Sequence, residues 1–246
     1  MLSTHVCTQR DRRSDWIGFL SFSVWTLVNA ATAIGVFRRN PAVAVFLLPT
    51  FAHEAVVAVC FLLRKPLLRQ VEGWVPRVSA YVATVITPAF YLACSHWFPA
   101  WIKSSPLPLS VTGMAFWVVG AYLGTWCVFR LRSAFSIEPQ ARTLVTNGPY
   151  RLARHPVYAS YLLQYTGVTL AHLTPATVTV FFVWLAVVTA RISYEESVLT
   201  AAFPQYAEYR RHVGRFAPRR TRKALPEPSV PAVPLSTPSR AGSAQS

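Results

Sequence analysis

Long apolar runs constrain the fold of this chain more than any other feature of its sequence. A helix that crosses the hydrocarbon core of a bilayer needs about 20 predominantly apolar residues. Four runs of this kind come first, and they span Trp16 to Phe37, Pro41 to Leu63, Ser79 to Trp101 and Leu107 to Phe129. We therefore predict an all-α fold, a multi-pass transmembrane helical bundle that begins with four spanning helices.

A fifth apolar run, from Pro156 to Ala190, is too long for a single crossing. Thr174-Pro175 divides it, because threonine is a good N-cap and proline suits the first position of a helix. We expect a tight C-terminal helical hairpin here, formed either by two crossings or by a re-entrant pair. Polar segments flank the hairpin on both sides, so they are expected to converge at its open end.

The charge content of the chain also points to a lipid environment. Charged residues make up 13% of the sequence, whereas soluble domains average about one quarter. The formal net charge is +15, which in a soluble protein would suggest a nucleic-acid ligand. Here the basic residues lie between and after the apolar runs, as membrane topology requires. We therefore expect membrane lipids, and no nucleic acid, among the partners.

The distribution of arginine and lysine predicts an orientation in the membrane. Basic residues concentrate before the first run, between the second and third, between the fourth and fifth, and after Ala190. The opposite side carries Arg38, Arg39 and Lys103. Because basic loops stay in the cytoplasm, both termini are expected there. In a bacterium the protein would lie in the inner membrane, and in a eukaryote in the endoplasmic reticulum.

Four regions follow from this pattern: a cytoplasmic leader at 1–15, the first four helices at 16–130, a C-terminal region with the hairpin at 131–220, and a tail at 221–246. The tail is rich in proline, serine and alanine and is expected to be disordered, because it cannot bury enough apolar surface to offset the entropy of ordering. The four cysteines are widely spaced, so neither a zinc site nor a disulfide framework is expected.

The polar segment before the hairpin is a candidate anion-binding site. Asn147-Gly148-Pro149 predicts a turn, and His155 before Pro156 stands near a helix N-terminus. Free N–H groups and the helix dipole favour an anion at such a position. Arg151 and Arg154 add positive charge. A basic cluster that binds lipid headgroups would explain the same residues.

The polar segment after the hairpin carries two adjacent carboxylates. Arg191 and Glu195 are four residues apart and share a helix face, while Glu196 points about 100° away. Acidic residues are scarce in this chain, with 9 in total. The pair therefore suggests a cationic or hydroxyl-rich ligand, and a solvated helix end is the alternative. His53 and Glu54, within the second run, either line a substrate path or bond to another helix.

Three segments in order carry a family resemblance. They read LVTNGPYRLARHPVY at 144–158, RISYEE at 191–196 and FPQYAEYRRHVGRFAP at 203–218. Together they resemble the isoprenylcysteine carboxyl methyltransferase and phospholipid methyltransferase family of integral membrane enzymes. The resemblance implies a methyltransferase that uses S-adenosylmethionine. It also implies a C-terminal half that encloses this cofactor near the cytoplasmic face, with a lipophilic small molecule or a lipidated substrate entering from the bilayer.

The resemblance further implies which residues act. It assigns catalysis to Arg191 and Glu196, with Arg191 near the methyl-accepting group. It assigns cofactor contacts to Arg142, Thr143, Leu144, Val145, Tyr150, His155, Pro156, Val157, Tyr158 and Glu196. The sequence departs from the family pattern at Pro204, which replaces a glycine, and at Arg142, which stands where a histidine is common.

The acceptor is open among three chemistries. A carboxylate is favoured, because it is ionised at neutral pH and Arg191 can hold it bidentately. A phospholipid amine would first have to lose a proton, for which His155 and Glu195 are candidates. A small hydrophobic thiol is the third. Two other classes compete with a methyltransferase: an NADPH-dependent enzyme similar to membrane sterol reductases, and a non-catalytic lipid-binding protein.

Overall fold

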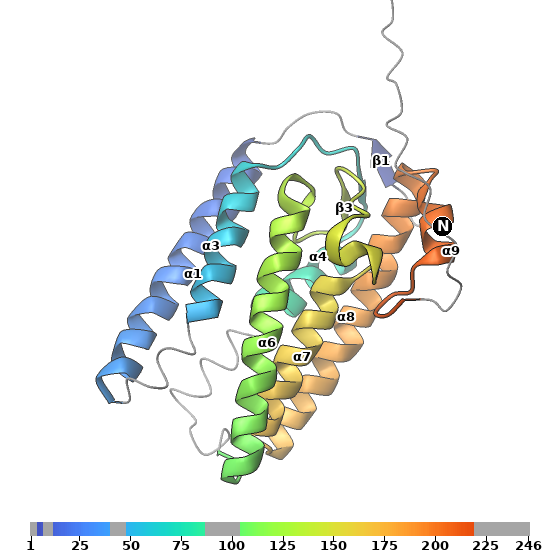
Figure 1. Ribbon diagram of the computed structural model, residues 1–246. Helices are drawn as coiled ribbons and strands as arrows, with labels where there is room; N and C mark the ends of the chain where they lie inside the picture. The colour runs from blue at the N-terminus through green and yellow to red at the C-terminus, as the bar shows by residue number, and fades with distance from the viewer. Residues whose placement is uncertain (1–3, 7–11, 40–47, 87–103, 219–246) are drawn as a thin grey trace, which may run out of the picture.

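The structure is a computed structural model that describes residues 4–6, 12–39, 48–86 and 104–218 of the chain (Figure 1). Most of the described residues lie in helices. The part of the third apolar run beyond residue 86, the start of the second run and the tail from residue 221 fall outside these ranges. The predictions made for them stay predictions.

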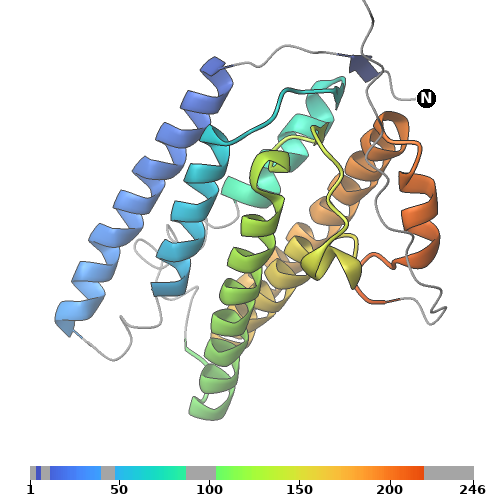
Figure 2. The same cartoon turned by 45° about the horizontal axis from the view of Figure 1, so that its top comes forward.

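Five long helices form the body of the described structure. α1 (Arg12–Arg39) packs against α3 (Leu48–Leu62), and α3 packs against α6 (Leu107–Leu131). α6 packs along α7 (Pro156–Ala171), and α7 leads into α8 (Pro175–Ala202). Figure 1 and Figure 2 show α1 and α3 side by side at one edge, with α6, α7 and α8 grouped next to them.

Two of the described helical segments, Leu107–Ala134 and Pro175–Ala202, are long and apolar enough to cross a membrane by length and composition. α1 and α3 contain shorter apolar stretches, Trp16–Ala31 and Pro49–Leu62. The protein is thus mostly helical with candidate spanning helices, as predicted. The number of four spans before the hairpin stays a prediction.

The predicted break of the last apolar run is confirmed. α7 ends at Ala171 and α8 begins at Pro175, with Thr174 as the N-cap. The hydroxyl of Thr174 accepts a hydrogen bond from the N–H of Thr177 at 3.3 Å, and the Thr177 hydroxyl accepts one from the N–H of Thr174 at 3.1 Å. This reciprocal pair satisfies two backbone donors that the first turn of a helix would otherwise leave free.

α6 and α7 approach each other through glycine. A Cβ atom at Gly113 would lie 2.3 Å from the carbonyl oxygen of Gly167, and a Cβ at Gly167 would lie 2.4 Å from that of Gly113. No larger residue fits either position without moving the helices apart. Small residues allow this close backbone approach between membrane helices. The contact holds the start of α6 against the end of α7.

A small antiparallel sheet corrects the expectation of an all-α fold. β2 (Arg69–Val71) pairs with both β1 (Thr4–Val6) and β3 (Gln140–Ala141), giving the strand order β1-β2-β3. Gln70 lies opposite His5 in β1 and Gln140 in β3. Strands of two or three residues are too short to show an alternating pattern, so the sequence did not predict them. β2 and β3 both contact α8. Because β3 belongs to the connection between α6 and α7, these contacts hold that connection against α8.

The remaining described elements are short. They are α4 (Trp74–Tyr81), the π-helical turn η1 (Val82–Ile86), the 3-10 turns η3 (Arg132–Ala134) and η4 (Gly148–Arg151), and α9 (Tyr206–His212). α4 and η1 pack against α8. β3 and α9 lie near the end of the bundle where α6 ends, α7 begins and α8 ends (Figure 1). The polar segments of the sequence meet at this end.

Candidate active site

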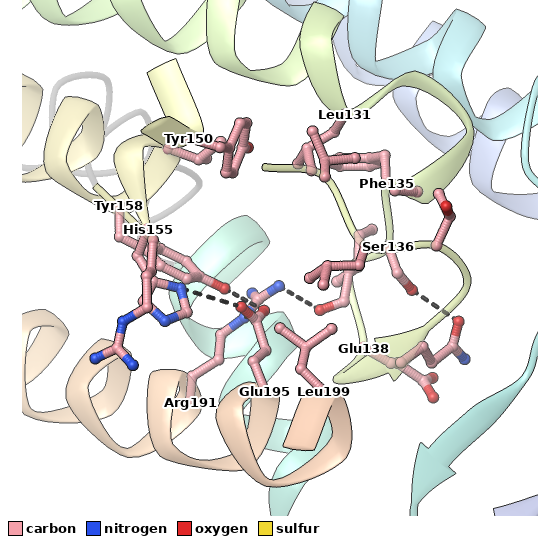
Figure 3. Close-up of a pocket in the computed structure, with 18 of the residues that line it drawn as sticks. Leu131, Phe135, Ser136, Glu138, Tyr150, His155, Tyr158, Arg191, Glu195 and Leu199 are labelled. Carbon is pink, nitrogen blue, oxygen red and sulfur yellow. Dashed lines mark hydrogen bonds and ion pairs between the residues drawn. The ribbon is translucent and has the colours of Figure 1, made fainter. Parts of the chain in front are cut away.

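A cavity lies at the open end of the helical hairpin. Its walls come from residues 131–161, residues 191–199 of α8, residues 206–209 of α9, and Thr84 of η1. Figure 3 shows His155, Tyr158 and Glu195 on one side of this cavity, with Phe135, Ser136 and Glu138 across from them. The two polar segments that flank the hairpin therefore converge, as the sequence predicts.

His155, Tyr158 and Glu195 form one polar wall. The Tyr158 hydroxyl donates a hydrogen bond to Oε1 of Glu195. Nδ1 of His155 lies 3.8 Å from Oε2 of the same carboxylate. The guanidinium carbon of Arg191 lies 5.4 Å from the centre of the Tyr158 ring, a cation–π contact. The wall thus presents a carboxylate and an aromatic ring to the cavity.

Arg191 is buried and its donors are almost fully used within the protein. Nε donates to Glu195 Oε1 at 3.2 Å, and Nη1 donates to the carbonyl oxygen of Ala80 at 3.0 Å. Nη1 also donates to Oγ1 of Thr84 at 2.5 Å, and Nη2 donates to the carbonyl of Ile137. A guanidinium has five N–H groups. Four of them are committed, so Arg191 joins α8 to η1 and to the loop after α6.

Glu196 does not line the cavity, and its carboxylate contacts three cationic or polar side chains. Its Oε1 lies 3.0 Å from Nη2 of Arg154 and 3.2 Å from Nε2 of His155. Its Oε2 accepts a hydrogen bond from Nη2 of Arg215 at 2.9 Å. This hydrogen bond raises the pKa of the Arg215 guanidinium above its usual value. Glu196 is buried, so the cations compensate for a charge removed from water.

Backbone hydrogen bonds hold the segment after α9 against the start of α7. The N–H of Arg154 donates to the carbonyl of Gly214 at 2.8 Å, and the N–H of His155 donates to that of Arg215 at 2.9 Å. The first and third motif segments are therefore adjacent in space, although about 60 residues separate them in the sequence.

The turn predicted at residues 147–149 leads directly into Tyr150, which lines the cavity. Gly148 has a φ of +59°, a conformation that residues with a Cβ rarely adopt. Tyr150 follows, and its carbonyl accepts a hydrogen bond from the Tyr209 hydroxyl at 2.6 Å. Burial raises the pKa of Tyr206 to about 12, so this neighbouring hydroxyl stays protonated at neutral pH.

Eight of the eleven residues assigned from the family resemblance line the cavity: Thr143, Leu144, Val145, Tyr150, His155, Val157, Tyr158 and Arg191. Arg142, Pro156 and Glu196 do not. Arg142 is buried beside the sheet and donates to the carbonyl of Lys65 and to Oε1 of Gln140. Pro156 occupies the first position of α7, as predicted from the X-Pro pattern.

Sequence reasoning gave no role to several residues of the site. Arg215 lies in the third motif segment, but only the fold reveals that it pairs with Glu196. Phe135 and Glu138 line the cavity from the loop between η3 and β3, and no motif marks them. Within the described part of the chain, no group of three or more histidine, cysteine, aspartate or glutamate residues is placed to hold a metal ion.

Residues 109–206, which run from α6 through α8 into α9, match the model of the phospholipid methyltransferase family. The family resemblance found in the motifs is thereby confirmed for this part of the chain. The match covers less than half of the chain, and the apolar helices agree with an integral membrane protein.

Two curated relatives share this region. The cobalt-zinc-cadmium resistance protein CzcN of Cupriavidus metallidurans is 30% identical over 139 residues, which cover 56% of this chain and 61% of that protein. The nickel-cobalt-cadmium resistance protein NccN of Alcaligenes xylosoxydans xylosoxydans is 29% identical over 141 residues, covering 56% and 62%. The chain thus spans about three fifths of the length of these relatives.

Among solved structures, this chain is similar to a eukaryotic intramembrane Ras methyltransferase, the isoprenylcysteine carboxyl methyltransferase, in a structure without a monobody. The match has a TM-score of 0.44 and 20% sequence identity, and it covers 82% of this chain and 94% of that chain.

Proposed function

We propose that the protein is an S-adenosylmethionine-dependent methyltransferase of the membrane that acts on a lipophilic acceptor. One observation carries the proposal: three motif segments far apart in the sequence meet at one cavity, and the first two lie inside the region that matches a methyltransferase family. We further propose that this end of the bundle faces the cytoplasm, because Arg130, Arg151 and Arg154 lie there and basic residues stay on that side.

The residues present fit the chemistry of S-adenosylmethionine. Arg154 lines the cavity, and its Nε and Nη1 atoms are buried without a hydrogen-bond partner of good geometry in the described residues. They suit the carboxylate of the methionyl group. Glu195 suits a hydroxyl or a positive charge, and the side chains of Leu144 and Leu199 suit an aromatic base. When bound, the cofactor supplies a methyl group on a positively charged sulfur.

Glu196 is proposed to act as a positioning residue rather than as a direct ligand. It does not line the cavity, and its oxygens already hold Arg154, His155 and Arg215. Its carboxylate orients Arg154 and His155, which do line the cavity. The role in catalysis and cofactor binding that the sequence assigns to it would then be indirect.

The preference for a carboxylate acceptor loses its physical support. It depended on an Arg191 that was free to hold the acceptor bidentately. Four of its N–H groups are instead committed to Glu195, to Thr84 and to the carbonyls of residues 80 and 137. We propose that Arg191 positions Glu195 and shapes the cavity wall, which leaves the acceptor to be recognised elsewhere.

Calorimetric titration of the detergent-purified protein with S-adenosylmethionine tests this function. We expect saturable binding to the wild type and at least tenfold weaker binding to Arg154→Gln. The matched control is Arg151→Gln, because Arg151 is the neighbouring arginine but is exposed and does not line the cavity. Melting temperatures of the three proteins show whether each is folded.

Absence of binding to folded wild type would refute the proposal, and NADPH would then be titrated to test the reductase alternative. Equal binding by the two arginine variants would refute the placement of the cofactor in this cavity. Lipid binding that weakens strongly with salt, without affinity for either cofactor, would favour a non-catalytic lipid-binding protein.

A further inference from the structure

One arginine of the segment after α9 contacts the candidate active site without lining its cavity. The side chain of Arg215 is 45% exposed, whereas that of its partner Glu196 is 8% exposed. Two hydrogen bonds join them: Nε of Arg215 donates to Oε1 at 3.3 Å, and Nη2 donates to Oε2 at 2.9 Å. Neither residue is among the described residues that line the cavity. Any effect of Arg215 on a ligand in the cavity is therefore indirect.

This pair differs from an ordinary ion pair on the protein surface. Two exposed side chains of opposite charge are screened by water, and their contact contributes little. Here one partner is buried, and the planar guanidinium meets both oxygens of the carboxylate, which is the geometry of the stronger charge-assisted contacts. Arg215 therefore fixes the orientation of the Glu196 carboxylate in addition to balancing its charge.

The orientation of Glu196 in turn determines that of two side chains on the cavity wall. Its Oε1 lies 3.0 Å from Nη2 of Arg154 and 3.2 Å from Nε2 of His155, and both of these residues line the cavity. Nε and Nη1 of Arg154 are buried without a hydrogen-bond partner of good geometry in the described residues. Because a guanidinium is planar and rigid, the contact through Nη2 determines where these remaining donors point.

The formal charges at this point favour an anionic ligand. Arg154 and Arg215 bring two positive charges to the single negative charge of Glu196. The neighbouring carboxylate of Glu195 has a partner of its own, the guanidinium of Arg191 at 3.2 Å. Among these five side chains, one positive charge therefore has no counter-charge, and a carboxylate in the cavity would balance it. Without Arg215, Glu196 would neutralise Arg154 and cancel that attraction.

The backbone holds the segment after α9 in place independently of the Arg215 side chain. Two backbone hydrogen bonds, of 2.8 and 2.9 Å, join residues 214–215 to residues 154–155. Val213 is buried, and its backbone pairs with that of Pro218. A substitution that neutralises the Arg215 side chain leaves these contacts in place, so its effect on a ligand can be separated from a loss of the local fold.

From this we infer that Arg215 is a positioning residue that makes the cavity selective for a cofactor with a carboxylate, and that it acts through Glu196 on Arg154. The inference rests on the proposed function, because the carboxylate is that of the methionyl group of S-adenosylmethionine. A residue outside the cavity, on the segment after α9, thereby joins those that determine cofactor affinity. Its effect is confined to ligands that carry the carboxylate.

Calorimetric titration of the detergent-purified, full-length protein with two matched ligands tests the inference. One ligand is S-adenosylmethionine, and the other is its decarboxylated form, which differs only in the missing carboxylate. Arg215→Gln should bind S-adenosylmethionine about fivefold more weakly than wild type does, because a charge-assisted contact is lost, while its affinity for the decarboxylated form should change less than about twofold. Arg215→Lys should recover part of the affinity, because it restores the charge but not the bidentate contact.

The matched control is Arg210→Gln, which removes an exposed positive charge from α9 and should bind both ligands as wild type does, because Arg210 does not line the cavity. Melting temperatures show whether each variant is folded. Three results would each overturn the inference: unchanged binding of S-adenosylmethionine by Arg215→Gln, an equal loss of affinity for the two ligands, or no recovery in Arg215→Lys. Absence of S-adenosylmethionine binding to folded wild type would instead refute the proposed function, so the two failures are distinguishable.

Discussion

Glu196 shows how a single buried carboxylate can organise a site that it does not enter. Its two oxygens draw Arg154 and His155 from the start of α7 and Arg215 from the segment after α9 to one point on α8. Three elements that are distant in the sequence are joined there. A buried carboxylate and its cationic partners compensate one another's charge. Removal of the carboxylate leaves the buried cations without a counter-charge.

Replacement of Glu196 by glutamine is therefore expected to destabilise the protein by about 3 kcal/mol, since Arg154 would remain buried without a counter-charge. Thermal unfolding of the detergent-solubilised protein measures this. The matched control is Glu208→Gln, whose exposed ion pair with Arg211 should contribute less than about 1 kcal/mol. Similar losses of stability in the two variants would show that the network around Glu196 stabilises the protein no more than an exposed ion pair does.

At the scale of elements, the close approach of Gly113 and Gly167 holds α6 and α7 together at the end of the pair away from the cavity. Gly113→Ala should destabilise the protein by about 1–3 kcal/mol, since the new Cβ would overlap the carbonyl of Gly167 and force the helices apart. Ala115→Val adds volume to an exposed position of the same helix and should have little effect. Equal melting temperatures for Gly113→Ala and wild type would contradict the close approach.

The turn of the hairpin depends on the cap at the start of α8. Thr174→Ala removes the hydroxyl that accepts from the N–H of Thr177, and it should lower the stability by about 1 kcal/mol. Thr174→Ser keeps the hydroxyl and should retain most of the stability. If serine proves as destabilising as alanine in thermal unfolding, the methyl group of Thr174, and not its cap, would be the stabilising feature.

At the scale of the whole molecule, the two ends of α7 should lie on opposite sides of the membrane. Leu152 precedes the helix and Leu173 follows it, and both are exposed. With the cavity on the cytoplasmic side, Leu152→Cys should react with a membrane-impermeant maleimide only in inside-out vesicles. Leu173→Cys should react only in right-side-out vesicles, with wild type as the background. The reverse pattern would contradict the orientation, and reaction of both cysteines on one side would indicate a re-entrant hairpin.

The sequence predicted the parts of the fold that depend on local patterns. The apolar runs marked the long helices, and Thr174-Pro175 marked the break between α7 and α8. The β1-β2-β3 sheet was missed because strands of two or three residues carry no period. The commitments of Arg191 were also hidden, since its partners are the carbonyls of Ala80 and Ile137, and any residue can supply a carbonyl. The motifs therefore predicted which residues lie together at the site. Only the fold shows which of their hydrogen-bonding groups are already used within the protein.

Methyl transfer itself tests the central claim most directly. The purified full-length protein, reconstituted in vesicles, is incubated with S-adenosylmethionine labelled on its methyl group, and label that enters the organic phase is counted. The acceptors offered are host membrane lipids, dodecylamine, dodecanoate and dodecanethiol. We predict protein-dependent label in the organic phase with at least one of these acceptors. No label above the heat-denatured control with any of these acceptors, from protein that is demonstrably folded, would contradict the account.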